Sequence, residues 1–108
     1  MERSSRLSGF YKQTPEERAQ ALRRFAGLTD EELQVFSAAG GLTLGLAEHM
    51  IENVVGVMGL PLGIATNFLI NGKDYLIPMA VEEPSIVAGA SLAARLVRDG
   101  GGFHTYST

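Results

Sequence analysis

The stretch LGIATNFLINGKDYLIPMAV at residues 62–81 decides the fold of this 108-residue chain. Two extended, largely apolar runs, at 62–70 and 73–81, flank Asn71-Gly72, the dipeptide best suited to the positive backbone angles of a two-residue hairpin turn. A hairpin of this kind presents one mainly apolar face, so another element must cover that face. The register set by the turn pairs Ile70 with Lys73, Phe68 with Tyr75, Thr66 with Ile77 and Ile64 with Met79.

A helix over about residues 84–98 is expected to follow the hairpin. Pro84 suits the first turn of this helix, where its missing N–H costs nothing. Apolar residues recur at helical spacing at Ile86, Val87, Ala90, Ala94, Leu96 and Val97. Because a hairpin and one helix cannot enclose this much apolar surface, we expect further covering structure, and the glycine run at 100–102 predicts a flexible link.

The N-terminal part of the chain predicts three short helices. Thr14-Pro15-Glu16-Glu17 is a capping-box start for a helix over about 15–26. The same pattern begins again at Thr29 and predicts a second helix that ends within 38–41. A third helix should cover about 43–53. Its inward-facing residues are expected to be Leu44, Ala47, Ile51 and Val54.

These elements together predict an α+β fold. We expect a helical arm at residues 1–41 and, at 42–108, a β-hairpin packed with helices that forms the start of a larger, incomplete domain. A chain of 108 residues is long enough for one small core.

Composition excludes several classes of function. The net charge is −3 and the basic residues are scattered, so no stripe of positive charge follows a nucleic-acid backbone. The chain has no cysteine, and His49 and His104 lie far apart in the sequence, so no metal site is predicted. The N-terminus has no apolar segment behind its basic residues, which predicts neither a signal peptide nor a membrane anchor and favours a cytoplasmic protein.

Two adjacent carboxylates, Glu82 and Glu83, lie between the second apolar run and the last predicted helix. A junction between a strand and a helix is a good place to hold a reacting group. Acidic residues are also favoured in the first turn of a helix, where they interact with its positive end. From the residues alone, a catalytic role and a capping role both remain open for this pair.

Three segments together resemble the beginning of the 3-hydroxy-3-methylglutaryl-coenzyme A reductases: HMIENVVG at 49–56, GLPLGIATNFLINGKDYLIPMAVEEPSIVAGAS at 59–91 and GGF at 101–103. The opening SRLSGFYKQTPEER, at 5–18, is similar to the class II form of bacteria and archaea. The resemblance implies an N-terminal fragment of an enzyme that is an obligate homodimer, with its active site formed between subunits.

The resemblance also implies roles for particular residues. The second glutamate of the family's EEP step is catalytic, which gives that role to Glu83; a carboxylic acid there can donate a proton to a carbonyl oxygen that accepts hydride. Ser85 matches the position that helps hold the free carboxylate of the acyl group. Glu52 and Asn53 match a signature near the substrate and the subunit contact. Glu82 keeps a structural role, as a cap or salt-bridge partner.

The reaction implied is the interconversion of 3-hydroxy-3-methylglutaryl-CoA with mevalonate and CoA, using two NADH or NADPH. The dinucleotide would be bound by parts of the enzyme outside this chain, which contains no G-x-G-x-x-G motif. The lysine, aspartate and histidine of the family's mechanism also come later in the full-length enzyme, so these residues alone should not catalyse. Two alternatives remain open: a non-catalytic interaction or CoA-binding module, and one half of a split enzyme.

Overall fold

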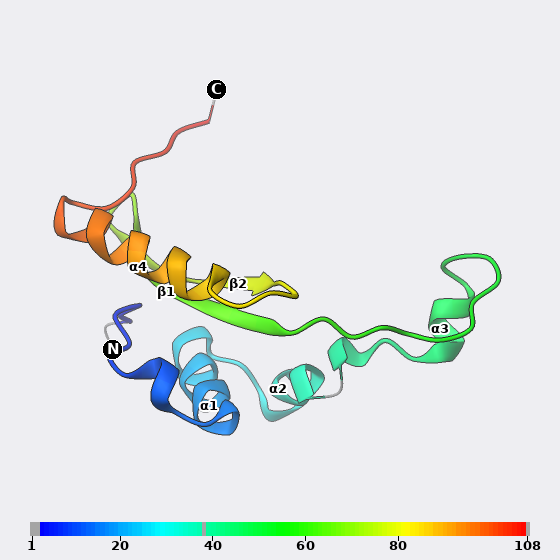
Figure 1. Ribbon diagram of the computed structural model, residues 1–108. Helices are drawn as coiled ribbons and strands as arrows, with labels where there is room; N and C mark the ends of the chain where they lie inside the picture. The colour runs from blue at the N-terminus through cyan, green and yellow to red at the C-terminus, as the bar shows by residue number, and fades with distance from the viewer. Residues whose placement is uncertain (1–2, 38, 108) are drawn as a thin grey trace.

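The computed structural model describes residues 3–37 and 39–107 and has the predicted α+β architecture. A two-stranded antiparallel sheet carries one long helix, and shorter helices precede the sheet. Figure 1 shows α4 lying along β1, and α3 at the end of an extension that leads away from both. The elements are η1 (Phe10–Lys12), α1 (Pro15–Ala26), α2 (Asp30–Ser37), η2 (Ala39–Gly41), α3 (Leu44–Glu48), β1 (Leu62–Ile70), β2 (Lys73–Ala80) and α4 (Ile86–Asp99).

The hairpin turn forms where the sequence predicts it. Asn71 and Gly72 have φ values of 51° and 77°, the two positive angles that a primed two-residue turn requires. Near the turn, β1 and β2 pair in the predicted register, with Ile70 opposite Lys73 and Phe68 opposite Tyr75.

Beyond these pairs the predicted register is wrong by one residue, because β1 contains a bulge. Ile77 pairs with Ala65 rather than with Thr66, and Met79 pairs with Gly63 rather than with Ile64. Asn67 has φ 71°, in the left-handed region, and this inserts one extra residue of β1 between the paired positions. Asparagine tolerates this conformation better than most residues, so the residue type at position 67 permits the bulge.

Helix α4 packs against β1 through small side chains, as the run of small residues predicts. Ala65 on β1 and Ala94 on α4 are buried, with exposed fractions of 0% and 1%. The N–H of Thr66 donates to Ser91 Oγ at 3.0 Å, so the helix also satisfies a backbone donor of the strand. The close approach is tightest at Gly63, where an added Cβ would lie 3.1 Å from a Val87 methyl group.

The start of α4 differs from the prediction. The helix begins at Ile86, with Ser85 as its N-cap residue, so Pro84 lies in the turn before it and not in its first turn. Ser85 has φ 77°, a left-handed angle that cannot continue a helix, and this explains the later start.

The first two helices confirm their sequence signals. The N–H of Glu17 donates to Thr14 Oγ1, and the N–H of Thr14 donates to Glu17 Oε1, each at 3.2 Å, which completes the predicted capping box of α1. Thr29 also caps α2: its Oγ1 accepts from the N–H of Glu32 at 3.1 Å and donates to Glu32 Oε1 at 3.1 Å, so the backbone half of the capping box is not made here. Helix α2 ends at Ser37; Ala38, within the predicted end of this helix, lies outside the described residues.

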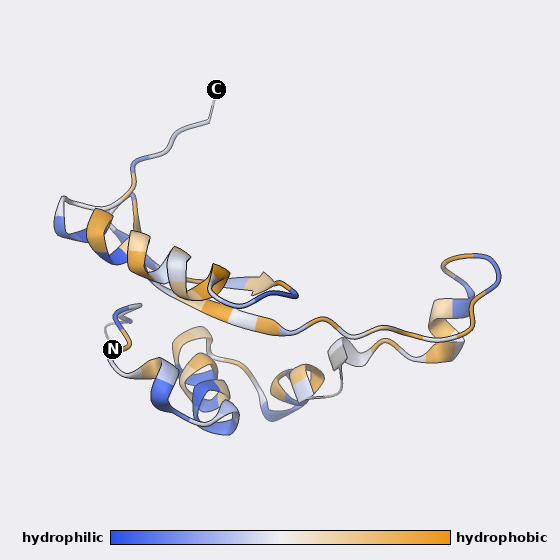
Figure 2. Cartoon of the chain, in the orientation of Figure 1, coloured by the Kyte–Doolittle hydropathy of each residue, from blue (hydrophilic) through white to orange (hydrophobic). Residues whose placement is uncertain are grey.

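The third predicted helix is much shorter than expected. It covers only Leu44–Glu48 rather than about 43–53, and of its predicted inward residues only Ala47 is buried. Leu44 and Ile51 are 55% and 65% exposed. A helix of this length gains most of its stability from packing, and no other helix or strand among the described residues covers it. Figure 2 shows apolar residues recurring along this extension.

The glycine run after α4 is not the predicted flexible link. The N–H of Gly102 donates to the carbonyl of Val97 at 2.9 Å, and the N–H of Phe103 donates to the carbonyl of Leu69 at 2.7 Å. The ring of Phe103 stacks on that of Phe68 with centroids 5.5 Å apart. The chain therefore returns to the edge of β1 at the end nearest the hairpin turn.

Gly102 offers a test of this return. Its φ is 86°, and an added Cβ would lie 2.5 Å from the carbonyl oxygen of Leu69, which belongs to rigid backbone. Gly102→Ala should lower the free energy of unfolding by about 2 kcal/mol or more, because it adds both backbone strain and a clash. Chemical denaturation measures the change. Gly89→Ala in α4 is the matched control: nothing lies within 4 Å of its added Cβ, so stability should rise by about 0.5–1 kcal/mol. Equal effects of the two substitutions would contradict the packing described.

Candidate functional site

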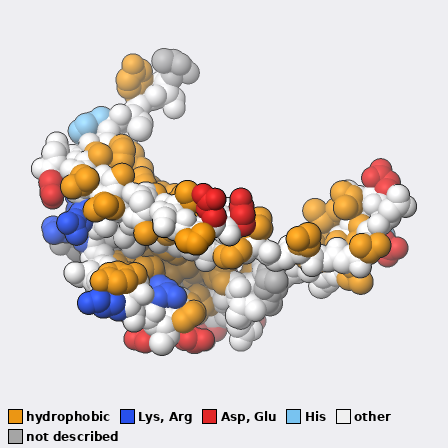
Figure 3. Space-filling view, in the orientation of Figure 1, with side chains coloured by type: hydrophobic (Ala, Val, Ile, Leu, Met, Phe, Trp, Pro, Cys, Tyr) orange, Lys and Arg blue, Asp and Glu red, His pale blue; other side chains and the backbone are white. Residues whose placement is uncertain are grey.

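An open groove of about 1340 Å³ lies between the N-terminal segment, the start of β1 and α4. Residues 6–12 form one wall, and the turn of Glu82 to Ser85, with the adjacent face of α4, contributes another. This groove contains the two glutamates and the serine that the sequence singles out. Figure 3 shows acidic side chains beside the start of α4, and basic side chains gathered on another part of the same face.

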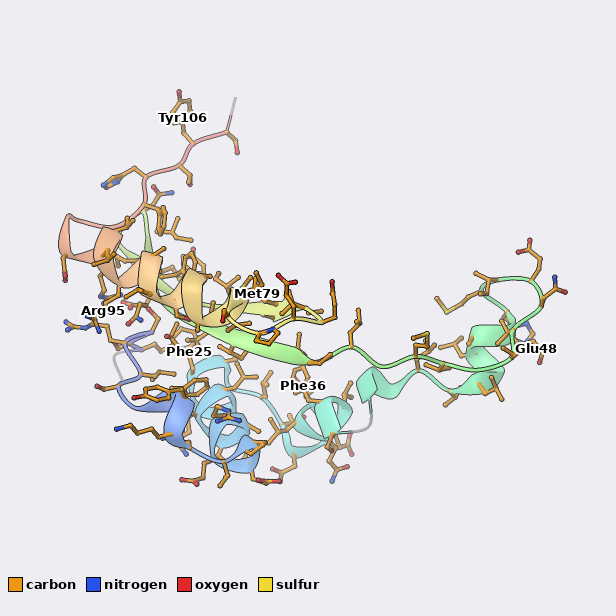
Figure 4. The ribbon with its side chains drawn as sticks, in the orientation of Figure 1. Phe25, Phe36, Glu48, Met79, Arg95 and Tyr106 are labelled. Atoms are coloured by element: carbon orange, nitrogen blue, oxygen red, sulfur yellow. The ribbon has the colours of Figure 1, made fainter. Side chains whose placement is uncertain are left out.

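Charged side chains of both signs line the groove. The basic residues are Arg6, Lys12, Arg18 and Arg95, and the acidic residues are Glu82, Glu83 and Asp99. Arg18 is partly committed, because its guanidinium donates to the carbonyls of Gln13 and Tyr11. Figure 4 labels Arg95 on α4, on the side where the N-terminal segment lies. A ligand with separate anionic groups would find hydrogen-bond donors among these basic side chains around the groove.

The turn that carries Glu83 and Ser85 is exposed and lies outside the helix. Ser85 is the N-cap residue of α4 by position, yet its side chain makes no capping hydrogen bond to the helix. A serine with φ 77° is uncommon, and backbone strain of this kind persists mainly where the surrounding structure imposes it, often at functional sites. Glu83 lies three residues before the first helical residue. It therefore does not cap α4, which was one of the two roles that the sequence left open for it.

Glu52 and Asn53 lie elsewhere. Both belong to the turn after α3 and are exposed, and Asn53 has φ 57°. Figure 4 marks this part of the chain with Glu48, at the far end of the extension from α4. The structure therefore brings Glu83 and Ser85 together in one turn, and it does not bring Glu52 and Asn53 to them within one chain.

A buried polar cluster supports the wall formed by the N-terminal segment. Asp74 Oδ1 accepts three hydrogen bonds: from the N–H of Ser5 at 3.0 Å, from Ser5 Oγ at 2.8 Å and from Arg98 Nη1 at 2.8 Å. Ser5 is 0% exposed, and the side chains of Asp74 and Arg98 are 20% and 16% exposed. The carboxylate thus joins the N-terminal segment, β2 and α4.

This environment changes the pKa of Asp74. Burial raises it, but the hydrogen bonds from the backbone and side chain of Ser5 and the charge of Arg98 lower it, and together these outweigh the burial. The pKa therefore lies below the ordinary value, because the folded state stabilises the carboxylate.

Comparison with known proteins identifies the family. The family model described as hydroxymethylglutaryl-coenzyme A reductase matches residues 14–108. The chain belongs to the hydroxymethylglutaryl-coenzyme A reductase family. The resemblance carried by the motifs at 49–56, 59–91 and 101–103 is thereby confirmed.

Individual relatives of this reductase family agree. The 3-hydroxy-3-methylglutaryl-coenzyme A reductase of Archaeoglobus fulgidus is 62% identical over 102 residues, which are 94% of this chain and 23% of that protein. The probable reductase of Borreliella burgdorferi is 45% identical over 51 residues, which are 47% of this chain and 12% of that protein. The class II reductase of Streptococcus pneumoniae, solved bound to NADPH in open conformations, matches with a TM-score of 0.80 and 35% identity over 90% of this chain and 26% of that one.

The chain spans about a quarter of the length of the reductases of Archaeoglobus fulgidus and Streptococcus pneumoniae. No helix among the described residues is long and apolar enough to cross a membrane.

The cluster of Ser5, Asp74 and Arg98 is the part of this reductase region that sequence reasoning missed. Asp74 follows the hairpin turn and Arg98 lies on the last turn of α4, so each has an ordinary reading as a surface charge. Their pairing depends on how α4 is placed over the hairpin, and no spacing in the sequence encodes that. The signal available in the sequence was Arg98, a charged residue on a mainly apolar face of the last helix.

The lowered pKa of Asp74 predicts how the stability of this reductase region depends on pH. The contribution of the carboxylate is fully present above the ordinary aspartate value of 3.8 and is lost as the pH falls through the lower pKa of the folded state. Asp74→Asn should therefore lower the free energy of unfolding at pH 7. In this variant the free energy of unfolding should also fall less steeply as the pH is lowered. Urea denaturation between pH 7 and pH 3 measures this. A variant with an unchanged acid decline would contradict the assigned role of the carboxylate.

Proposed function

We propose that this chain is part of a class II hydroxymethylglutaryl-coenzyme A reductase, which interconverts 3-hydroxy-3-methylglutaryl-CoA and mevalonate plus CoA with two NADH or NADPH. The observation that carries the proposal is the turn of Glu82 to Ser85, which has the EEPS sequence implied by the family resemblance and lines the groove. Membership of the reductase family supports the reaction, and the similarity to the class II enzyme of Streptococcus pneumoniae supports the class.

Glu83 is the proposed catalytic residue. When hydride reaches the carbonyl carbon of a thioester, negative charge develops on the oxygen, and a carboxylic acid beside that oxygen can donate a proton to it. The exposed side chain of Glu83 lies on the rim of the groove, where a ligand lying along α4 would reach it. Glu82 also lines the groove, and the choice of Glu83 rests on the resemblance, in which the second glutamate of the EEP step is catalytic.

Ser85 is proposed to bind the free carboxylate of the acyl group. Its hydroxyl makes no capping bond to α4, and the first amides of that helix are donors at the positive end of the helix dipole. The phosphate groups of CoA are also anionic, so the groove arginines suit the other end of the substrate. The ligand class that fits the groove is an acyl thioester with negative charge at both ends.

The nicotinamide dinucleotide is proposed to bind outside this chain. The glycine run at 100–102 follows the C-terminal end of α4, whereas a dinucleotide pyrophosphate binds a glycine turn before the N-terminus of a helix. NADH or NADPH would therefore be held by other parts of the enzyme, and we assign no step of hydride transfer to this region.

We further propose that the reductase is a cytoplasmic homodimer and that the extension around α3 contacts the second copy. Exposed apolar side chains recur along the extension, and a surface of this kind is typical of an interface. In that arrangement Glu52 and Asn53 would approach the substrate bound by the partner. The boundary between a helical arm at 1–41 and the substrate-binding domain at 42–108 is part of the same proposal.

The catalytic assignment predicts a contrast between the two glutamates. In the product of the complete reading frame, Glu83→Gln should reduce kcat roughly 10²–10⁴-fold with little change in KM, because it removes an interaction made in the transition state. Glu82→Gln is the matched control, with the same loss of charge one residue away, and should leave kcat within about threefold. Mevalonate-dependent reduction of NAD⁺ or NADP⁺ measures both. Normal turnover of Glu83→Gln would show that the assignment is wrong.

The role of Ser85 requires two variants, because its backbone is strained. Ser85→Ala removes the hydroxyl but keeps the strain of φ 77°, whereas Ser85→Gly removes both. If the hydroxyl binds the acyl carboxylate, both variants should raise KM by roughly tenfold with a smaller change in kcat. A glycine variant with the KM of the wild type would instead assign the serine to backbone geometry alone.

A further inference from the structure

The N-terminal segment, residues 3–12, is attached to the hairpin and α4 through one residue, Ser5. Within the described residues, the hydrogen bonds that join this segment to the hairpin and α4 all involve Ser5. The carbonyl of Ser5 accepts from the N–H of Asn67 at 2.8 Å, and its hydroxyl lies 3.0 Å from the carbonyl of Phe68. Both contacts lie at the bulge of β1.

The carboxylate of Asp74 is the centre of this attachment. A serine hydroxyl has one proton, and between the Phe68 carbonyl and the Asp74 carboxylate the charged group is the stronger acceptor. Asp74 Oδ1 also accepts from the Ser5 N–H, so two of its three hydrogen bonds go to the N-terminal segment. The third, from Arg98, fixes the carboxylate to α4 and keeps its charge paired.

The attached segment is the part of the chain that encloses the groove. Directly after Ser5, residues 6–12 line the groove, and Arg6 and Lys12 are two of its basic side chains. The polar partners of Asp74 are Ser5 and Arg98 rather than these two side chains, and Asp74, on β2, does not line the groove itself. Asp74 can therefore affect a ligand only indirectly, through the placement of the N-terminal segment and of α4.

We propose that Asp74 is a positioning residue of the groove: by binding Ser5 and Arg98 together it holds the N-terminal segment in place as a wall of the ligand site. The attachment follows from the contacts described, whereas its effect on turnover rests on the function proposed above. Loss of the attachment would move Arg6 and Lys12 away from the ligand and leave Glu83 and Ser85 in place.

Hydrogen–deuterium exchange tests the attachment without any assay of activity. In Ser5→Ala, which leaves the pair of Asp74 and Arg98 intact, amides of residues 3–12 should exchange roughly tenfold faster or more, because a hydrogen bond to a charged group is lost. Asp74→Asn should give a larger increase in the same segment. Amides of the hairpin should keep their exchange rates in Ser5→Ala, so that the result is separated from general unfolding.

The matched control is Asp30→Asn. It removes one aspartate charge from another ion pair, that of Asp30 with Arg23 at 3.1 Å, which joins α2 to α1 and not to the N-terminal segment. Exchange of residues 3–12 should be unchanged in this variant. Unchanged exchange of the segment in Ser5→Ala and Asp74→Asn would overturn the proposal.

A kinetic measurement on the complete gene product then tests the effect on the site. Ser5→Ala should raise KM for 3-hydroxy-3-methylglutaryl-CoA by roughly tenfold at nearly constant kcat, because the wall contributes to binding and not to the reacting atoms. If residues 3–12 exchange faster in Ser5→Ala while KM stays unchanged, the segment does not belong to the ligand site. That result would overturn the positioning role. A wild-type protein without reductase activity would instead reject the proposed function, and the exchange result would still decide the attachment.

Discussion

The bulge at Asn67 is the constraint on which the rest of the structure depends. Its left-handed backbone adds one residue to β1 and turns polar groups of the strand outward from the ladder. These groups find partners on separate segments: the N–H of Asn67 bonds to Ser5 at 2.8 Å, and its Nδ2 bonds to the Ser91 carbonyl at 3.2 Å. Without the bulge, β1 would lose the hydrogen bonds that hold the N-terminal segment and α4 at the same place. The groove between the segment and the helix would then lose its shape.

The packing of α4 extends this constraint to the site. Alanine at 65 and at 94 lets the helix approach the strand closely, and the hydroxyl of Ser91 replaces a ladder partner for the strand. Once the helix axis is fixed, the turn before it must connect the end of β2 to the first helical residue over a short distance. Ser85 makes that connection with a left-handed angle, so the orientation of the EEPS turn is a consequence of helix packing as well as of local sequence.

Sequence reasoning succeeded where the determining residues are local. The capping box at Thr14, the cap at Thr29 and the Asn71-Gly72 turn each specify their element within four residues, and the structure contains all three. It failed where the cause is distant. Asn67 has the appearance of a polar residue in a strand, and only the surrounding partners make the bulge favourable. The third helix has a helical pattern but no surface to pack against, and the cluster around Asp74 joins residues 69 positions apart. The functional importance of Glu83 came from a family resemblance, because its residue type and position also fit a cap.

The position of Glu83 outside α4 keeps its carboxyl apart from the amides at the start of that helix. A side chain in the first turn of a helix interacts with the positive end of the helix dipole. That interaction falls off beyond the terminal turn, and Glu83 lies three residues before Ile86, on the far side of Pro84 and Ser85. The strained angle at Ser85 thus separates two tasks: the amides of α4 remain available to an anionic group of the ligand, and the glutamate is kept apart from them. A helix that began at Pro84 would have placed the acid and the anion in competition for the same donors.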